Sequence, residues 1–153
     1  MKTLTILRND DSDSRSNDIK IFIADDDQMY LQALGYFLKK NTNDKIYCFK
    51  SGEECLKNMN LKPDVILLDY YLNEDKPDAL NGIETLKRIK RISPNTIIIM
   101  LSGQKDLSVA LKTLKAGAFT YIPKDREAFS AIQKTISYIQ TKKQTASWKQ
   151  KKK

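Results

Sequence analysis

The segment that most constrains the fold of this chain is a short apolar run, Val65 to Leu68, that ends on the carboxylate Asp69. Four consecutive aliphatic residues without polar alternation predict a strand that is covered on both faces, as in parallel sheets flanked by helices. In open α/β sheets, ligands bind in the crevice outside the carboxyl ends of the strands. Asp69 therefore lies where chemistry is expected, although an Asp after a strand can also serve only as a turn former.

The rest of the chain alternates between short apolar segments and segments with apolar residues at helical spacing. Strands are expected at residues 19–24, 45–49, 65–68, 96–101 and 119–122, and each is followed by a helix. This alternation predicts the α/β class, with a five-stranded parallel sheet and helices on both faces. The right-handedness of crossover connections and the number of strands favour the flavodoxin-like strand order 2-1-3-4-5.

Local signals predict where several helices begin and end. Asp27 is expected to cap the first helix, and Ser51 with Glu54 three residues later has the pattern of a capping box. Ser93-Pro94 should end the third helix, because proline disfavours helical backbone in the residue before it. Gly117 can adopt the left-handed conformation that closes the fourth helix.

The predicted strand order places Asp25 and Asp26, at the end of the first strand, beside Asp69. Three crowded carboxylates repel one another, so they require a cation or a retained proton. Oxygen ligands that leave room for water and phosphate suit Mg²⁺. Lys124 and Ser102 leave two other strands at the same edge. A metal ion, an ammonium and a hydroxyl around one carboxylate form a phosphoryl-transfer site with Asp69 as the nucleophile.

Four segments at four strand ends carry a resemblance to a known family. They are Ile-Ala-Asp25-Asp26-Asp27, Leu-Leu-Asp69, Met-Leu-Ser102-Gly103 and Gly117-Ala-Phe-Thr-Tyr121-Ile-Pro-Lys124. In this order and placement they resemble the receiver domain of two-component response regulators, over about residues 19–140. As a combination the segments are specific, although no single one is.

The resemblance implies a role for each residue of the acidic site. Asp69 matches the phosphoacceptor, which takes a phosphoryl group from the phosphohistidine of a sensor histidine kinase or phosphotransfer protein. Asp25 and Asp26 match the acidic pair around Mg²⁺, with Asp69 and the backbone carbonyl of Tyr71 as further ligands. Lys124 matches the lysine that contacts the phosphoryl oxygens.

The resemblance also implies a switch and an output surface. Ser102 matches the switch hydroxyl that moves toward the phosphoryl group, and Tyr121 matches the aromatic residue that turns inward behind it. Considered alone, Ser102 could simply cap the next helix and Tyr121 could be a half-buried strand residue. The output surface would be the helix over 107–116, the strand over 119–122 and the final helix, where a downstream protein would bind; a homodimer through this face is left open.

Three departures from the family pattern bear on the site. The loop over residues 73–81 is longer and more polar than usual, so it is expected to be a mobile insertion. Asp125 stands where a proline with a cis bond is common, and a cis bond without proline costs about 2.5 to 4 kcal/mol. Tyr71 and Gln104 lie two residues beyond the acceptor and the switch hydroxyl, at positions that tune dephosphorylation in the family. The Tyr71 side chain is expected to shield the phosphoryl group from water.

Composition excludes several classes of site. The chain has no histidine, which removes Ser-His-Asp and Cys-His nucleophiles, His-ligated metals and a phosphohistidine carrier. Cys48 and Cys55 lack metal-ligand spacing and fit a reducing compartment. No apolar run reaches membrane-spanning length and no signal sequence is recognised, so a cytoplasmic protein without membrane association is expected.

The two ends of the chain are predicted to lie outside the domain. Residues 1–18 are expected to be a flexible lead, residues 19–140 the receiver domain and residues 141–153 a basic tail. The tail carries six of the 27 basic residues and no acidic one. It could contact nucleic acid, but a solvated, mobile end is the favoured interpretation, and nucleic acid is an improbable partner.

The leading hypothesis is a single-domain response regulator that signals through altered protein contacts and is not an enzyme, beyond catalysing its own phosphorylation and slow dephosphorylation. Its main alternative is a constitutive, receiver-like interaction module that is never phosphorylated. An Mg²⁺-dependent phosphatase would need a further acid or base and a substrate pocket, neither of which the sequence indicates. DNA binding through the basic tail is the weakest alternative.

Overall fold

The computed structural model describes residues 5–6, 18–74 and 76–151. Five parallel strands form its sheet: β2 (Lys20–Ala24), β3 (Lys45–Phe49), β4 (Val65–Asp69), β5 (Ile97–Ser102) and β6 (Thr120–Pro123). Their order, β3-β2-β4-β5-β6, is the flavodoxin-like order predicted from the sequence. A two-residue strand, β1 (Thr5–Ile6), pairs antiparallel with β3 and extends the sheet at that edge.

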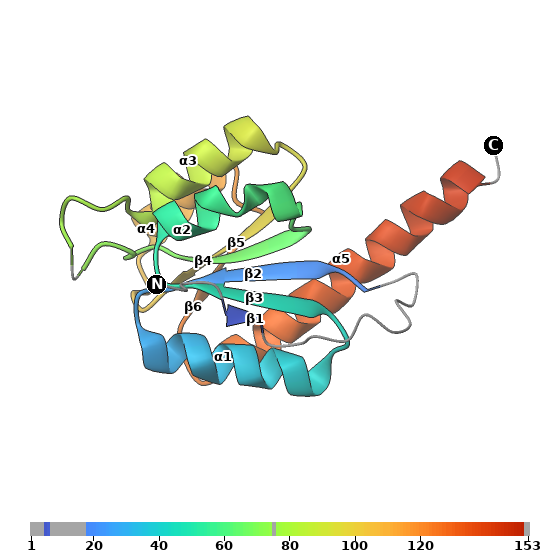
Figure 1. The fold of residues 1–153 in the computed structure, drawn as a ribbon, viewed down its shortest axis with the longest axis horizontal. Helices are drawn as coiled ribbons and strands as arrows, with labels where there is room; N and C mark the ends of the chain where they lie inside the picture. Colours follow the sequence, from blue (N-terminus) through green and yellow to red (C-terminus); the bar gives the residue numbers. More distant parts are fainter. Residues whose placement is uncertain (1–4, 7–17, 75, 152–153) are drawn as a thin grey trace.

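In the described part of the chain, four α-helices and one short 3₁₀ helix lie between strands, and a fifth α-helix follows the last strand. They are α1 (Gln28–Asn41), α2 (Gly52–Lys57), the 3₁₀ helix Met59–Leu61, α3 (Gly82–Ile92), α4 (Leu107–Lys115) and α5 (Ala128–Lys151). Helices α1 and α5 lie on one face of the sheet, and α2 and α3 lie on the other (Figure 1). None of the described helices is both long and apolar enough to cross a membrane.

Alternating strand residues build two apolar cores, one on each face of the sheet. Ile21, Val65 and Leu67 pack with α1 and α5, whereas Phe22 and Ile66 pack with α2 and α3. Every residue of β4 is buried. The uninterrupted apolar run that ends on Asp69 is thus a central strand covered on both faces, as predicted.

Most of the predicted helix ends are confirmed. The Asp27 side chain accepts from the N–H groups of Met29 and Tyr30, Ser93 follows the last residue of α3, and Gly117 has a φ of 110°. The capping box at Ser51 is only half formed. Ser51 Oγ accepts from the Glu54 N–H (3.1 Å), but the Glu54 carboxylate accepts from Lys50 N–H rather than from that of Ser51.

The two ends of the chain differ from the prediction in one respect each. Residues 5–6 form β1, although a lead without structure was expected over residues 1–18; residues 1–4 and 7–17 lie outside the described part. The basic segment expected to be a mobile tail continues α5 as far as Lys151 (Figure 1). Its sequence lacks glycine and proline and is rich in lysine and glutamine, which have good helix propensity.

Candidate functional site

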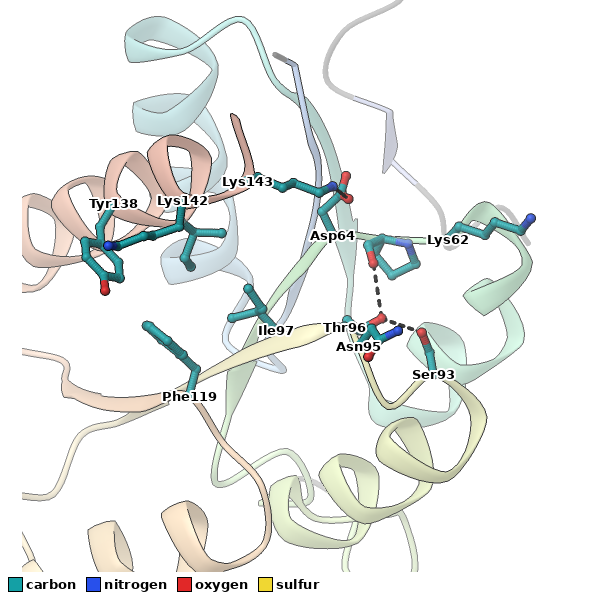
Figure 2. Close-up of a pocket in the computed structure, with 12 residues that line it drawn as sticks. Lys62, Asp64, Ser93, Asn95, Thr96, Ile97, Phe119, Tyr138, Lys142 and Lys143 are labelled. Atoms are coloured by element: carbon teal, nitrogen blue, oxygen red, sulfur yellow. Dashed lines mark hydrogen bonds and ion pairs between the residues drawn. The ribbon is translucent and has the colours of Figure 1, made fainter. Parts of the chain in front are cut away.

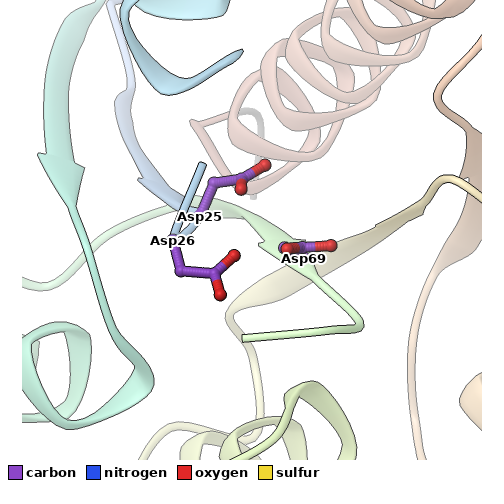
Figure 3. Close-up of side chains that lie close together, drawn as sticks. All are labelled: Asp25, Asp26 and Asp69. Atoms are coloured by element: carbon purple, nitrogen blue, oxygen red, sulfur yellow. The ribbon is translucent and has the colours of Figure 1, made fainter. Parts of the chain in front are cut away.

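Three carboxylates meet at the carboxyl edge of the sheet (Figure 3). Asp69 is the last residue of β4, and Asp25 and Asp26 directly follow β2, its hydrogen-bonded neighbour. One carboxylate oxygen from each of the three lies within 4.8 Å of the others. Asp25 and Asp69 are buried, and Asp26 is half-buried. The strand order therefore does bring the three predicted acids together.

Local hydrogen bonds fix the turn that carries Asp25. Its backbone N–H donates to the carbonyl of Phe49 (3.1 Å), and its Oδ1 accepts from the Asp27 N–H (2.9 Å). Asp27 in turn caps α1. This chain of contacts holds the acidic segment between the end of β2 and the start of α1, so the first carboxylate is positioned before any ligand binds.

The backbone after Asp69 is equally constrained. Asp69 Oδ1 accepts from the Tyr71 N–H (3.3 Å), and the Tyr70 N–H donates to the carbonyl of Leu101 on β5 (2.8 Å). The first residue of α3, Gly82, donates its N–H to the Tyr70 carbonyl (3.0 Å). The start of α3 thus lies against the backbone that carries the predicted acceptor.

Lys124 joins the acidic cluster from the loop after β6. Its Nζ lies 2.7 Å from Asp25 Oδ2 and 3.3 Å from Asp69 Oδ1. Its backbone N–H donates to the Ser102 carbonyl (2.7 Å), which fixes the start of the side chain. No cis peptide bond occurs among the described residues, so the bond to Asp125 is trans, and the ammonium nevertheless reaches both carboxylates.

Burial and charge together set the protonation of this cluster. Burial, followed by repulsion from Asp25, raises the pKa of Asp69 to about 7, against the lowering effect of Lys124. For Lys124, burial alone would lower the pKa, but the charges of Asp69 and Asp25 raise it overall. The lysine therefore stays charged at neutral pH, while a cation or a proton is still needed to offset the crowded acids.

The donor set of the acidic cluster fits Mg²⁺. Three carboxylates supply hard oxygen ligands, which this ion prefers, and the half-buried Asp26 leaves one side accessible to solvent. The cluster contains no sulfur or imidazole ligand that would favour a softer metal. Asp25, Asp26 and Asp69 could thus hold a divalent cation.

A hydrogen-bonded bridge centred on Gln104 lies beside the cluster. The buried Ser102 hydroxyl accepts from the Gln104 N–H (3.2 Å), and the Tyr71 hydroxyl donates to Gln104 Oε1 (3.0 Å). The Tyr121 hydroxyl donates to the Gln104 backbone carbonyl. Ser102 does not cap α4, because Asp106 is the capping residue. Tyr121 is half-buried, and its hydroxyl is tied to the loop that follows Ser102.

Tyr30 is a residue of this site that sequence reasoning missed. The Lys124 Nζ lies 4.4 Å from the centroid of its ring, on the side of α1 that faces the site. The Tyr30 hydroxyl is buried and has no hydrogen-bond partner among the described residues, and burial raises its pKa to about 12. The Phe129 ring packs edge-on against it, with centroids 5.6 Å apart. The spacing of apolar residues does not show which aromatic residue of a helix contacts a lysine that is distant in the sequence. The only available signal was that Tyr30 lies three residues after Asp27, in the first turn of the helix that begins at the site.

A hydrogen bond links the loop over residues 73–81 to α2. The Leu80 N–H donates to Glu53 Oε1 (2.6 Å), and the Ala79 N–H donates to the Lys76 carbonyl (2.9 Å) within the loop. Residue 75 lies outside the described part. The expected mobility of this insertion stays a prediction.

Comparison with known proteins decides the family. The family model of the response regulator receiver domain matches residues 21–137. The chain belongs to the response regulator receiver family. As such it is a receiver of two-component signalling, a family whose members generally accept a phosphoryl group and bind Mg²⁺ at an acidic pocket.

Individual relatives agree with this assignment. The chain is 33% identical, over 72% of its length, to a protein-glutamate methylesterase/protein-glutamine glutaminase of Clostridium acetobutylicum, and it spans only 32% of that relative's length. The response regulator domain of Thermotoga maritima CheB is 26% identical, with a TM-score of 0.71 over 81% of this chain and 97% of that one. The Francisella response regulator 1452 receiver domain, 24% identical with a TM-score of 0.72 over 82% and 99%, shows the same fold.

Proposed function

We propose that this receiver accepts a phosphoryl group on Asp69 from the phosphohistidine of a kinase or phosphotransfer protein. The observation that carries the proposal is the placement of Asp69 Oδ1 3.3 Å from the Lys124 ammonium, with oxygens of Asp25 and Asp26 within 4.8 Å. This arrangement has a nucleophile, an ammonium and a cation site around one point, which is what phosphoryl transfer requires.

In the proposed transfer, an Asp69 carboxylate oxygen attacks phosphorus. The new O–P bond forms as the N–P bond of the phosphohistidine breaks, and the departing imidazole takes up a proton from solvent. Lys124 is already beside the attacking oxygen, so its charge can offset the negative charge of the phosphoryl oxygens without rearrangement. Asp25, Asp26, Asp69 and the Tyr71 backbone carbonyl would hold Mg²⁺, which when bound supplies further positive charge at those oxygens.

Intact-mass spectrometry after incubation with acetyl phosphate and Mg²⁺ tests this proposal. Wild-type protein should gain the mass of one phosphate, and Asp69→Ala should gain none because the nucleophile is gone. Omitting Mg²⁺ should also suppress the gain. Asp78→Ala, an exposed acid in the loop, is the control and should be labelled like wild type. Absence of labelling in wild type, under conditions that label another receiver, would favour the constitutive interaction module.

We further propose that Ser102 and Tyr121 carry the signal to a downstream protein. Phosphorylation would draw the Ser102 hydroxyl toward a phosphoryl oxygen and move Gln104, to which the Tyr121 hydroxyl is bonded. The output surface would be formed by α4, β6 and α5. Exposed leucines along one side of α4, with Leu107 at 75%, Leu111 at 48% and Leu114 at 44% exposure, support a protein partner there.

Tyr71→Ala is expected to shorten the lifetime of the phosphorylated state. The Tyr71 ring packs against Tyr70 (centroids 4.8 Å apart) and its hydroxyl bonds to Gln104, so the side chain is held between the backbone after Asp69 and the loop after Ser102. Removing it should admit water and raise the dephosphorylation rate about threefold to tenfold, the equivalent of ~1 kcal/mol in the barrier. The rate is measured by loss of the phosphate mass after the donor is removed. Tyr71→Phe separates the ring from its hydrogen bond, and an unchanged rate in Tyr71→Ala would contradict the shielding role.

Tyr30→Leu is expected to slow phosphorylation by acetyl phosphate about fivefold, because it removes a cation–π contact with Lys124 worth ~1 kcal/mol. Tyr30→Phe keeps the ring and should react within about twofold of wild type. If the Tyr30 ring acts by positioning the Lys124 ammonium, Tyr30→Leu should no longer change the phosphorylation rate when Lys124 is also replaced by alanine. A difference of equal size in that background would mean that Tyr30 acts only through the stability of α1.

A further inference from the structure

A cavity lies at the edge of the sheet opposite to Asp69. It has a volume of about 580 Å³ and is bounded by the segments that precede β4, β5 and β6 and by α5 (Figure 2). This volume lies within the range of small-molecule sites. Because the strands are parallel, the cavity is separated from the acidic cluster by the length of the sheet, so it does not belong to the phosphoacceptor site.

Hydrogen bonds preform one wall of this cavity. Thr96 Oγ1 donates to the Pro63 carbonyl (3.2 Å) and lies 2.7 Å from Ser93 Oγ. Asp64 links two strands, since its Oδ2 accepts from the Lys20 N–H (2.9 Å) and its carbonyl accepts from the Ile97 N–H (3.0 Å). A ligand would therefore meet groups that are already fixed, which lowers the entropy lost on binding.

The apolar side of the cavity has two aromatic rings open to solvent. Phe119 is 46% exposed and Tyr138 is 53% exposed, and their ring centroids lie 6.4 Å apart. Ile97 and Ile139 line the space beside them (Figure 2). Contact with a flat apolar body would remove this aromatic surface from water and is favourable for that reason.

The polar side of the cavity is cationic. Among the residues that the structure describes, Lys62, Lys142 and Lys143 line it, together with one acid, Asp64. That carboxylate is already paired with Lys143. The Lys142 Nζ lies 5.5 Å from the centroid of the Tyr138 ring, so a cation stands beside the exposed aromatic surface. The excess of ammonium groups favours an anion and disfavours a neutral or cationic ligand.

We infer that this cavity binds a small organic anion with a flat, apolar body, such as an aromatic carboxylate. The rings of Phe119 and Tyr138 contact the body, and Lys142, whose ammonium lies beside the Tyr138 ring, contacts the anionic group (Figure 2). The site does not depend on Asp69 or on its phosphorylation. It gives the protein a ligand-binding input at the middle of α5 that is independent of the kinase.

Titration of the full chain with 2-naphthoate, followed by ¹H–¹⁵N NMR, tests this inference. Saturable shifts are expected for the amides of Thr96, Phe119 and Tyr138. The neutral analogue 2-naphthalenemethanol should bind at least about fivefold more weakly, as should the Lys142→Gln and Tyr138→Ala variants. Lys39→Gln removes an exposed charge from α1, whose residues do not line the cavity, and should bind like wild type. Asp69→Ala should also bind like wild type, which separates this site from the proposed function.

Several results would overturn the inference. Shifts that do not saturate, equal binding of the neutral analogue, or unchanged binding by both cavity variants would each exclude an anion site. Tighter binding of the acidic peptide acetyl-Asp-Phe-Glu-amide at the same amides would assign the cavity to a protein segment instead. Shifts at these amides that follow protein concentration without any ligand would assign it to a second copy of the chain.

Discussion

Replacing Asp69 by asparagine is expected to stabilise the metal-free protein at pH 8 while abolishing phosphorylation. The reason is that the acceptor is buried beside Asp25, which raises its pKa from an ordinary 3.8 to about 7. A pKa difference of that size corresponds to ~4 kcal/mol. The pKa of about 7 already includes the favourable contact with Lys124. Because the buried asparagine amide keeps part of the cost of removing a polar group from water, the expected net gain in the free energy of unfolding is on the order of 2 kcal/mol.

The raised pKa of Asp69 determines how the stability difference between wild type and Asp69→Asn changes with pH. Between about pH 4 and pH 7, folded Asp69 is protonated to a greater extent than the unfolded carboxyl, so the folded state binds more protons. Stability contributed by the protonated group is complete below the unfolded pKa and is lost as the pH rises through the folded pKa. The advantage of asparagine should therefore be small near pH 4.5 and should grow until about pH 8.

Urea unfolding with EDTA at several pH values measures the effect. Asp78→Asn, an exposed acid in the loop over 73–81, is the matched control and should show no such trend. Adding Mg²⁺ should reduce the difference in the free energy of unfolding between Asp69→Asn and wild type, because the cation would stabilise only the wild-type site. Equal stability of wild type and Asp69→Asn at pH 8 without metal, or a gap that does not change with pH, would contradict the proposed cause.

The sequence was enough to predict the central strands and the acidic cluster because both depend on strong, local signals. A fully apolar run that ends on Asp69 can only be satisfied by burial on both faces, and parallel strands then bring their carboxyl ends to one edge. With the strand order predicted, the meeting of Asp25 and Asp69 followed without side-chain detail. Lys124 was predicted for the same reason, since it leaves β6 at that edge.

The features that were missed depend on weak or long-range signals. Strand β1 is two residues long, which is too short for any periodic pattern. Helix α5 continues beyond its last apolar core residue because polar residues with good helix propensity follow. The contact of Tyr30 with Lys124 and the bridge through Gln104 depend on side-chain directions, which loop and helix positions alone do not determine.

Gly82→Ala is expected to be strongly destabilising and to impair the acceptor. A Cβ atom at Gly82 would lie 2.5 Å from the Asp69 carbonyl oxygen and 2.6 Å from the Tyr70 Cα. Both are backbone atoms, so relief requires either the start of α3 or the end of β4 to shift. We expect a loss of about 2 to 3 kcal/mol in the free energy of unfolding, typical of overpacking at a rigid site.

The same shift should slow phosphorylation of Asp69, because it displaces the backbone that aims the carboxylate at Lys124. Urea unfolding measures the first effect, and the rate of phosphate mass gain measures the second. Gly103→Ala is the control: apart from its chain neighbours, no described residue has an atom within 4 Å of a Cβ there, so stability and rate should stay close to wild type. If Gly82→Ala is as stable and as reactive as Gly103→Ala, then close packing of the start of α3 against the end of β4 does not position Asp69. The position of Asp69 would in that case be set by the sheet alone.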